Sequence, residues 1–120
     1  EWERVGRLRL RLMDRQAAIE ALERARALGP SVAGLLDLAL AFHLAGELGG
    51  EITATEQATQ LEPGSAPAWS RYAHALARSD RLSDAVAATE RAAELAPGDL
   101  EVRALLVRLR EAAPRALPAV

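Results

Sequence analysis

The sequence is built from copies of one pattern. Residues 32–65 and 66–99 align without a gap, and both copies end in the same Leu-x-Pro-Gly pattern. A third copy covers about 1–31, with Trp2 aligned to Trp69. Three copies of nearly equal length are typical of stacked repeat units, none of which can bury its apolar face alone.

Each copy has the pattern of two amphipathic helices. Apolar residues recur at intervals of three and four, which is the spacing of one helical face. The pattern predicts helices over 1–13, 15–28, 32–45, 66–79, 83–96 and 100–112. The predicted N-caps are Asp14, Ser31, Ser65, Asp99, and either Asp80 or Ser83. The buried stripe of 15–28 is predicted to be Ala18, Ala21, Leu22, Ala25 and Leu28.

The second copy is irregular after residue 45. Gly46, Gly49 and Gly50 lie close together, and each glycine lowers helix stability by about 0.5–1 kcal/mol relative to alanine. We therefore expect a late or bent helix that starts near Glu51 and runs to Leu61. Either the repeat is distorted locally here, or the Glu51 side chain points away from the contact between the two helices.

The repeat resembles the tetratricopeptide repeat (TPR). The third copy matches the pattern with Trp69, Tyr72, Ala73, Leu76, Ala85, Thr89, Ala92 and Pro97. The resemblance implies an all-α fold, a right-handed α-solenoid of three antiparallel helix pairs over about 1–31, 32–65 and 66–99. Residues 100–112 would form a capping helix, completing one domain over 1–113. Pro114 is expected to end this helix, and 114–120 to form a flexible tail. Trp69 is expected in the core.

Composition and motifs exclude several classes of function. The chain has no Cys, which excludes disulfides and thiolate metal sites, and a net charge of −2 argues against nucleic-acid binding. No apolar run is long enough to span a membrane, so we expect no membrane insertion. His43 and His74 are far apart, and no catalytic or metal-ligating pattern accompanies them. We expect no enzyme activity, no cofactor and no metal.

The TPR resemblance places a ligand groove along the first helix of each pair, where a peptide or helix of a partner would bind. The groove residues that it implies are Arg4, Arg7, Arg11, Leu36, Asp37, Leu40, His43, Leu44, Arg71, His74, Arg78 and Arg108. Arginine binds carboxylates through a forked geometry. We expect a protein or peptide ligand with apolar side chains between acidic ones. The alternative is that these arginines are only the solvated face of a lysine-free protein.

One TPR specialisation does not fit. Repeats that bind the C-terminal tails of heat-shock chaperones use five positions. These are a Lys and an Asn in the first repeat, an Asn in the second, and a Lys and an Arg in the third. The matching positions here hold Glu3, Arg7, Asp37, Pro67 and Arg71, of which only Arg71 agrees. The sequence therefore predicts that chaperone tails are not the ligand.

The favoured function is an adaptor or scaffold in a larger assembly. We expect a bacterial source, because the chain has arginine and no lysine, as codon bias in a GC-rich genome would produce. Two alternatives stay open. The first alternative is a module through which copies of the chain associate with each other, and the second is a non-catalytic scaffold segment of a longer enzyme. The first residue is Glu1 rather than Met, which indicates a mature form or an excised segment. Either the cytoplasm or the periplasm suits such a chain, which is expected to be soluble.

Overall fold

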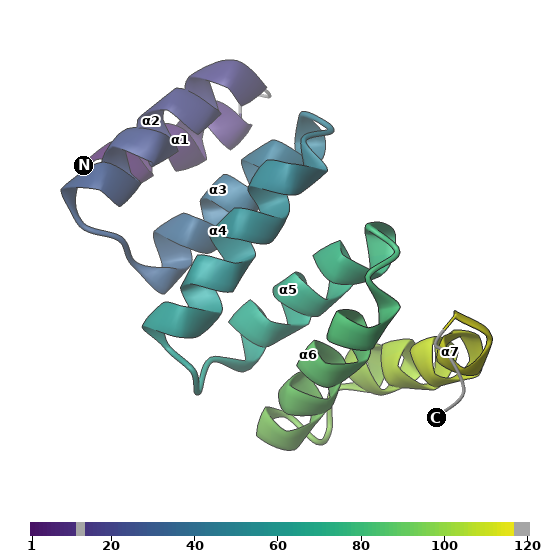
Figure 1. The fold of residues 1–120 in the computed structure, drawn as a ribbon. Coiled ribbons are helices and arrows are strands. Elements are labelled where there is room, and N and C mark those ends of the chain that lie inside the picture. The colour runs from purple at the N-terminus through teal and green to yellow at the C-terminus, as the bar shows by residue number, and fades with distance from the viewer. Residues whose placement is uncertain (12–13, 117–120) are drawn as a thin grey trace. The chain divides into compact units, whose positions relative to one another are not determined.

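The computed structural model describes residues 1–11 and 14–116, with side chains described for 1–9 and 14–112. Described residues form helices only, in the order shown in Figure 1. The helices are α1 (Trp2–Arg11), α2 (Arg15–Leu28), α3 (Val32–Leu44), α4 (Leu48–Leu61), α5 (Ala66–Arg78), α6 (Leu82–Leu95) and α7 (Leu100–Ala116). The predicted all-α class and the three helix pairs with an additional last helix are confirmed.

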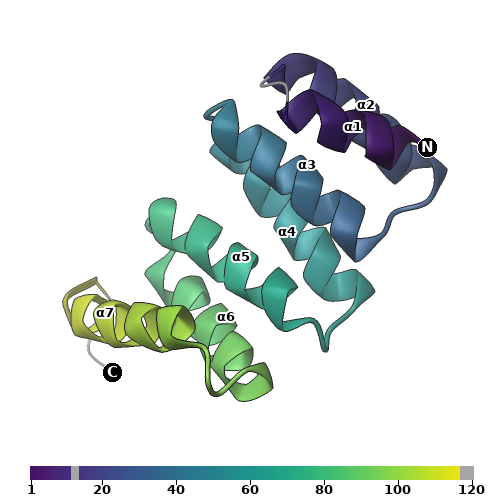
Figure 2. The ribbon, with the colours of Figure 1, turned by 180° about the vertical axis from the view of Figure 1, so that it is seen from behind.

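The chain divides into two compact units. Unit 1 covers Glu1–Glu62 and contains α1 to α4; unit 2 starts at Pro63 and contains α5 to α7. In unit 1, α2 packs on α3, and each of α1 and α3 packs on the helix that follows it. In unit 2, α6 packs on both α5 and α7. Figure 2 shows the same elements from behind.

Four of the predicted caps are formed. The carboxylate of Asp14 accepts a hydrogen bond from the Ala17 N–H at 3.1 Å, and the hydroxyls of Ser31 and Ser65 act in the same way on α3 and α5. Asp99 accepts from two N–H groups of α7. These side chains satisfy amide donors that have no partner inside the helix.

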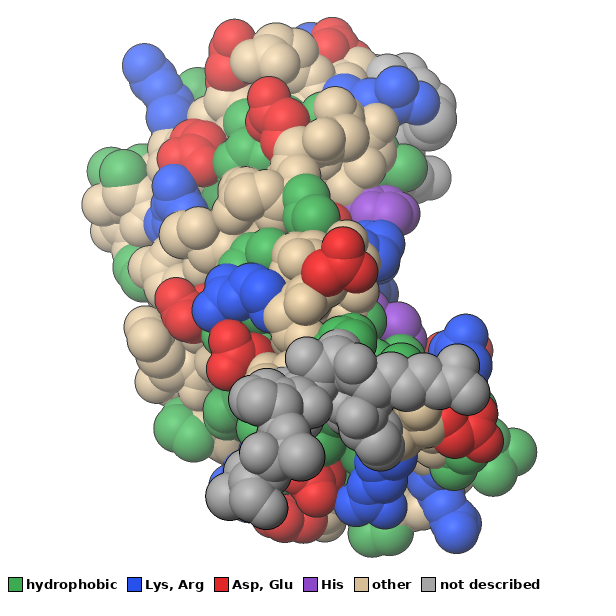
Figure 3. Space-filling view, turned by 45° about the vertical axis from the view of Figure 1, so that its right-hand side comes forward, with side chains coloured by type: hydrophobic (Ala, Val, Ile, Leu, Met, Phe, Trp, Pro, Cys, Tyr) green, Lys and Arg blue, Asp and Glu red, His purple; other side chains and the backbone are tan. Residues whose placement is uncertain are grey.

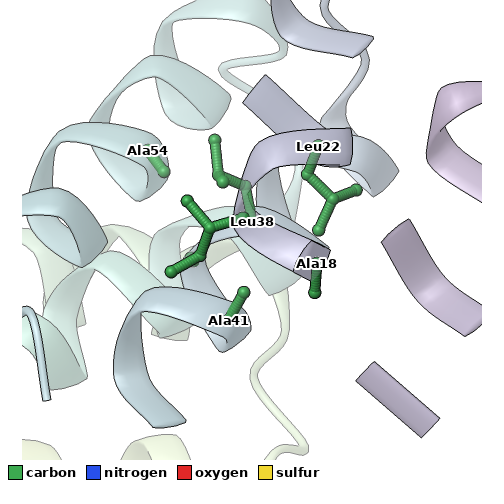
Figure 4. Close-up of a cluster of buried hydrophobic side chains, with 7 residues drawn as sticks. Ala18, Leu22, Leu38, Ala41 and Ala54 are labelled. Atoms are coloured by element: carbon green, nitrogen blue, oxygen red, sulfur yellow. The ribbon is translucent and has the colours of Figure 1, made fainter. Parts of the chain in front are cut away.

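The core of unit 1 is built from alanine and leucine. Ala18 and Leu22 of α2 meet Leu38 and Ala41 of α3, and Ala54 of α4 completes the contact (Figure 4). These side chains are nearly inaccessible to solvent. Small alanines allow the helix backbones to approach closely, which is how a core with so few aromatic residues is filled.

The expectation for the start of α4 was wrong. The helix begins at Leu48 and includes Gly49 and Gly50. Gly50 lies against Phe42 of α3, and a Cβ on this glycine would be 2.7 Å from the ring atom Cδ1. The glycine therefore allows the close approach of the two helices, and packing of Phe42 compensates for its low helix propensity.

Neither alternative for Glu51 is correct, because its side chain points toward α3 and the helix is continuous around it. Its side chain is buried, with the residue 8 % exposed. The Oε1 atom lies 3.4 Å from Nδ1 of His43, at the end of α3. A buried carboxylate needs polar or charged partners to replace water, and His43 is placed to be one.

The core of unit 2 is built from residues of all three of its helices. Ala73 and Leu76 of α5 are buried, as are Ala85, Ala88 and Ala92 of α6 and the apolar stripe of α7. Trp69 is only half-buried, because its indole lies near the surface, where Nε1 donates to the Pro63 carbonyl at 2.8 Å. The Trp69 and Tyr72 rings are 6.1 Å apart.

Three further details differ from the prediction. Leu28 is 77 % exposed, because the helical step turns it away from α3; Ile19 is buried instead. α6 begins at Leu82 without a side-chain cap, since Asp80 belongs to the preceding turn with φ 62°. α7 continues past Pro114, whose fixed φ suits a helix and whose missing N–H costs one bond near the helix end. Residues 117–120 of the predicted tail lie outside the described residues.

Candidate functional site

In unit 1, the predicted ligand residues lie on α1 and α3. Two polar contacts join these helices. The Nε and Nη2 atoms of Arg7 are each 3.0 Å from Oδ2 of Asp37, and the Ser31 hydroxyl donates to Glu3 at 3.0 Å. The Arg7 side chain is 51 % exposed and that of Asp37 24 %. Two predicted ligand residues thus bind each other, so a ligand carboxylate would have to compete with Asp37 for Arg7.

The apolar part of this face is shared with the core. Leu40 and Leu44 are half-buried and pack against the hydrophobic cluster of unit 1. Leu36 is also half-buried, whereas His43 is exposed beside the carboxylate of Glu51. The leucines therefore offer only part of their surface to a ligand.

Two arginines of α1 complete the predicted set in unit 1. Arg4 is exposed and forms no ion pair within the described residues. The side chain of Arg11 lies outside the described residues. Among the described arginines of α1, Arg4 is thus placed to meet a ligand anion without first breaking an internal ion pair.

In unit 2, the predicted residues lie on α5 and α7. Arg71 and Arg108 are exposed, and neither forms an ion pair within the part of the chain that is described. Arg78 is exposed at the end of α5. His74 is half-buried, and its Nδ1 lies 2.7 Å from the Ser70 carbonyl oxygen, so that the geometry assigns the proton to Nδ1.

Most other arginines are engaged within the chain. Exposed acidic and basic side chains are interspersed on the face in Figure 3. The arginines that form ion pairs besides Arg7 are Arg9, Arg26, Arg81, Arg91 and Arg110. An exposed arginine without such a pair keeps its full hydrogen-bonding capacity for a ligand.

Sequence reasoning missed two contacts. The guanidinium of Arg24 lies 4.9 Å from the ring centroid of Trp2, a cation–π arrangement, and His43 meets Glu51. Glu51 stands where the next copy of the repeat has Ala85, and an acidic residue at that position was a signal that it needed a partner. Which side chain would reach it depends on how α3 and α4 pack, which the sequence pattern does not specify.

The described residues contain no group of three or more His, Asp or Glu side chains that could hold a metal ion. Within the same residues, no helix combines the length and the apolar character that crossing a membrane requires. The polar contacts described above are hydrogen bonds and ion pairs between helices or within one helix. The arginine, histidine and leucine side chains on these helices can bind a ligand through ion pairs, hydrogen bonds and apolar contacts.

Comparison with known proteins gives a family match over part of the chain and a fold over nearly all of it. Residues 52–109 match the family model described as tetratricopeptide repeat. No curated protein matches the sequence. Among solved structures, the first TPR domain of Spaghetti (RPAP3), bound to an HSP90 peptide SRMEEVD, has a TM-score of 0.86 at 19 % identity, over 94 % of this chain and 90 % of that chain.

Two further structures show the same fold. The TPR domain of Sgt2 from Aspergillus fumigatus has a TM-score of 0.83 at 22 % identity, over 99 % of this chain and 83 % of that chain. The second TPR domain of human RPAP3, in complex with the HSP70 peptide SGPTIEEVD, has a TM-score of 0.80 at 21 % identity, over 88 % of each chain. The fold inferred from the repeat is confirmed.

Proposed function

Because residues 52–109 match the tetratricopeptide repeat and the chain has the fold of such domains, we propose that it is a protein-interaction module in which the first helix of each pair presents the ligand-binding residues. The ligand is a peptide or helix of a partner protein, with apolar side chains next to carboxylates. The module acts as an adaptor without catalytic activity of its own. A bacterial source, which the lysine-free composition favours, belongs to the same proposal.

The observation that carries the proposal is the state of Arg71. It is exposed on the first helix of its pair and has no ion pair within the described residues. It also occupies the one position that matches the family's carboxylate-binding pattern. A free guanidinium can bind a carboxylate through two parallel N–H donors, which gives both affinity and orientation.

The similar domains support the ligand class by analogy. The peptides named with two of them, SRMEEVD and SGPTIEEVD, combine carboxylates with apolar residues. The chaperone tails themselves are not proposed here, since Glu3 and Asp37 put negative charge where the family's pattern has neutral or basic residues. A carboxylate that approaches unit 1 would have to compete with Asp37 for Arg7 and would be repelled by its charge.

The experiment selects peptides from a random library and measures their affinity by fluorescence anisotropy. Selected sequences should be enriched in Asp or Glu beside apolar residues. Arg71→Glu should weaken binding by about tenfold or more, because it replaces attraction with repulsion. Arg15→Glu is the matched control, since Arg15 is also exposed without an ion pair in the described part of the chain but lies on α2. Selection of basic peptides, or equal losses in both variants, would refute the proposal.

Leu40→Glu tests the apolar part of the ligand-binding face in the same assay. Leu40 packs partly on the core, so circular dichroism must first show that the variant is folded. A folded variant should lose affinity for the apolar positions of the selected peptides. Unchanged affinity would remove α3 from the binding face.

A further inference from the structure

Exposed apolar side chains concentrate on α1, α2 and α7, the first two helices and the last. The large apolar side chains that are most exposed among the described residues are Leu8, Leu28, Leu61, Leu100 and Val107. Of these, only Leu61 lies on another helix. Exposed apolar side chains that lie together are candidates for contact with another chain.

The first exposed surface is the outer α1–α2 face, the side of this pair that is turned away from α3 (Figure 1). Ala18 and Leu22 of α2 face α3 in the core, and the helical step places Ala17 and Ala21 on other sides of α2. An open cleft of about 470 Å³ lies on this face, lined by Trp2, Val5, Arg9, Ala17, Glu20, Ala21 and Arg24. Leu28 adjoins Trp2 at one end of the face.

The second surface is the outer stripe of α7. Val102, Leu105 and Leu109 of this helix are buried in unit 2. Positions three and four apart share a helical face, so the opposite side carries Leu100, Ala104, Val107 and Glu111, all of them exposed. Leu100 is 77 % and Val107 55 % exposed. α7 therefore also exposes two large apolar side chains, Leu100 and Val107, on the side turned away from the core of unit 2.

Charges of both signs lie beside the two surfaces. The outer α1–α2 face has Glu20 and Arg24, with Arg24 over the Trp2 ring, whereas its Arg9 already pairs with Asp14; α7 has Arg103 and Glu111 beside its stripe. Glu20, Arg103 and Glu111 form no ion pair within the described residues. An acid on one surface can thus meet an arginine on the other, while the apolar side chains of both are removed from water.

We propose that the outer stripe of α7 in one copy packs into the outer α1–α2 face of a second copy of this chain. Leu100 and Val107 would fill the cleft beside Trp2, Glu111 would meet Arg24, and Arg103 would meet Glu20. Burial of apolar surface supplies the driving force, and the charges fix the orientation. Because the two surfaces differ, the contact is heterologous and each copy keeps one surface open for another.

Sedimentation equilibrium tests this contact at protein concentrations from about 0.01 to 1 mM, the range of a weak interface. The average mass of the wild type should rise with concentration. Leu28→Glu and Val107→Glu should each remain monomeric, because each puts a charge into one apolar surface. Leu61→Glu is the matched control, since Leu61 is an exposed leucine outside both surfaces, and this variant should associate like the wild type.

Mixing the two monomeric variants provides the decisive measurement. Leu28→Glu retains the α7 stripe and Val107→Glu retains the α1–α2 face, so an equimolar mixture should form a one-to-one complex and stop there. Circular dichroism should show the same helix content in all variants. A wild type that stays monomeric, a mixture that stays monomeric, or a loss of association in Leu61→Glu would overturn the proposal.

Discussion

Gly50 of α4 lies directly against the aromatic ring of Phe42 of α3. A Cβ at this glycine would be 2.7 Å from Cδ1 of the ring, whereas a Cβ at the neighbouring Gly49 would meet nothing within 4 Å. Two adjacent glycines in the first turn of one helix therefore have different roles. Gly50 is required by packing, and Gly49 only lowers the helix propensity.

Alanine substitutions separate these two roles. Gly49→Ala should raise the free energy of unfolding by about 0.5–1 kcal/mol, because alanine restricts the unfolded chain and favours the helix. Gly50→Ala should lower it by about 1–3 kcal/mol, because the Phe42 ring must move. Chemical denaturation followed by circular dichroism measures both values. Changes of the same sign in the two variants would contradict the contact.

A second pair tests the turns between paired helices. Gly46 has φ 75° and Asp80, its counterpart in the next repeat, has φ 62°, so both turns use the left-handed conformation. Gly46→Ala should cost about 1–2 kcal/mol, the strain of a side chain in that region. Asp80→Gly should relieve such strain and raise the thermal midpoint. A lower midpoint for Asp80→Gly would show that its carboxylate compensates for the backbone conformation.

Trp69 contributes by both packing and hydrogen bonding. Trp69→Ala should lower the free energy of unfolding by about 3 kcal/mol, the low end for loss of a large aromatic side chain, because the residue is half-buried. Trp69→Phe should cost less, since it removes mainly the hydrogen bond from Nε1 to the Pro63 carbonyl, worth about 0.5–1.5 kcal/mol. Equal melting temperatures for the wild type and Trp69→Ala would refute any stabilising role.

Removing the internal partner of Arg7 should strengthen binding of an acidic peptide. Asp37→Asn weakens the ion pair and removes a negative charge from the α1–α3 face, so the affinity should rise several-fold and fall with added salt. Asp84→Asn is the control, because Asp84 pairs with Arg81 at the start of α6. An increase in both variants would indicate only the change in net charge, and no increase in Asp37→Asn would exclude Arg7 from binding.

Much of the fold follows from local signals. The period, the four polar caps and most of the apolar stripe of α2 came from spacing and residue type, because a helix face is defined by residues three and four apart. Leu28 and Trp69 were predicted to be more buried than they are. Periodicity identifies which face of a helix is apolar, but it does not show how much of that face a neighbouring helix covers. Among the predicted ligand residues, the described arginines are exposed and the leucines and His74 are half-buried, and the pairing of Arg7 with Asp37 was not foreseen.

The sequence alone determined that this chain forms paired helices in repeated units with the tetratricopeptide pattern, because helix propensity, caps and apolar spacing act within a few residues of one another. Only the tertiary structure decided that Gly50 supports Phe42, that Glu51 is buried beside His43, and that Arg71 is unpaired where Arg7 is bound. Those outcomes depend on distances between side chains from different helices. Such distances are set by how closely the backbones pack, and no single helix encodes them.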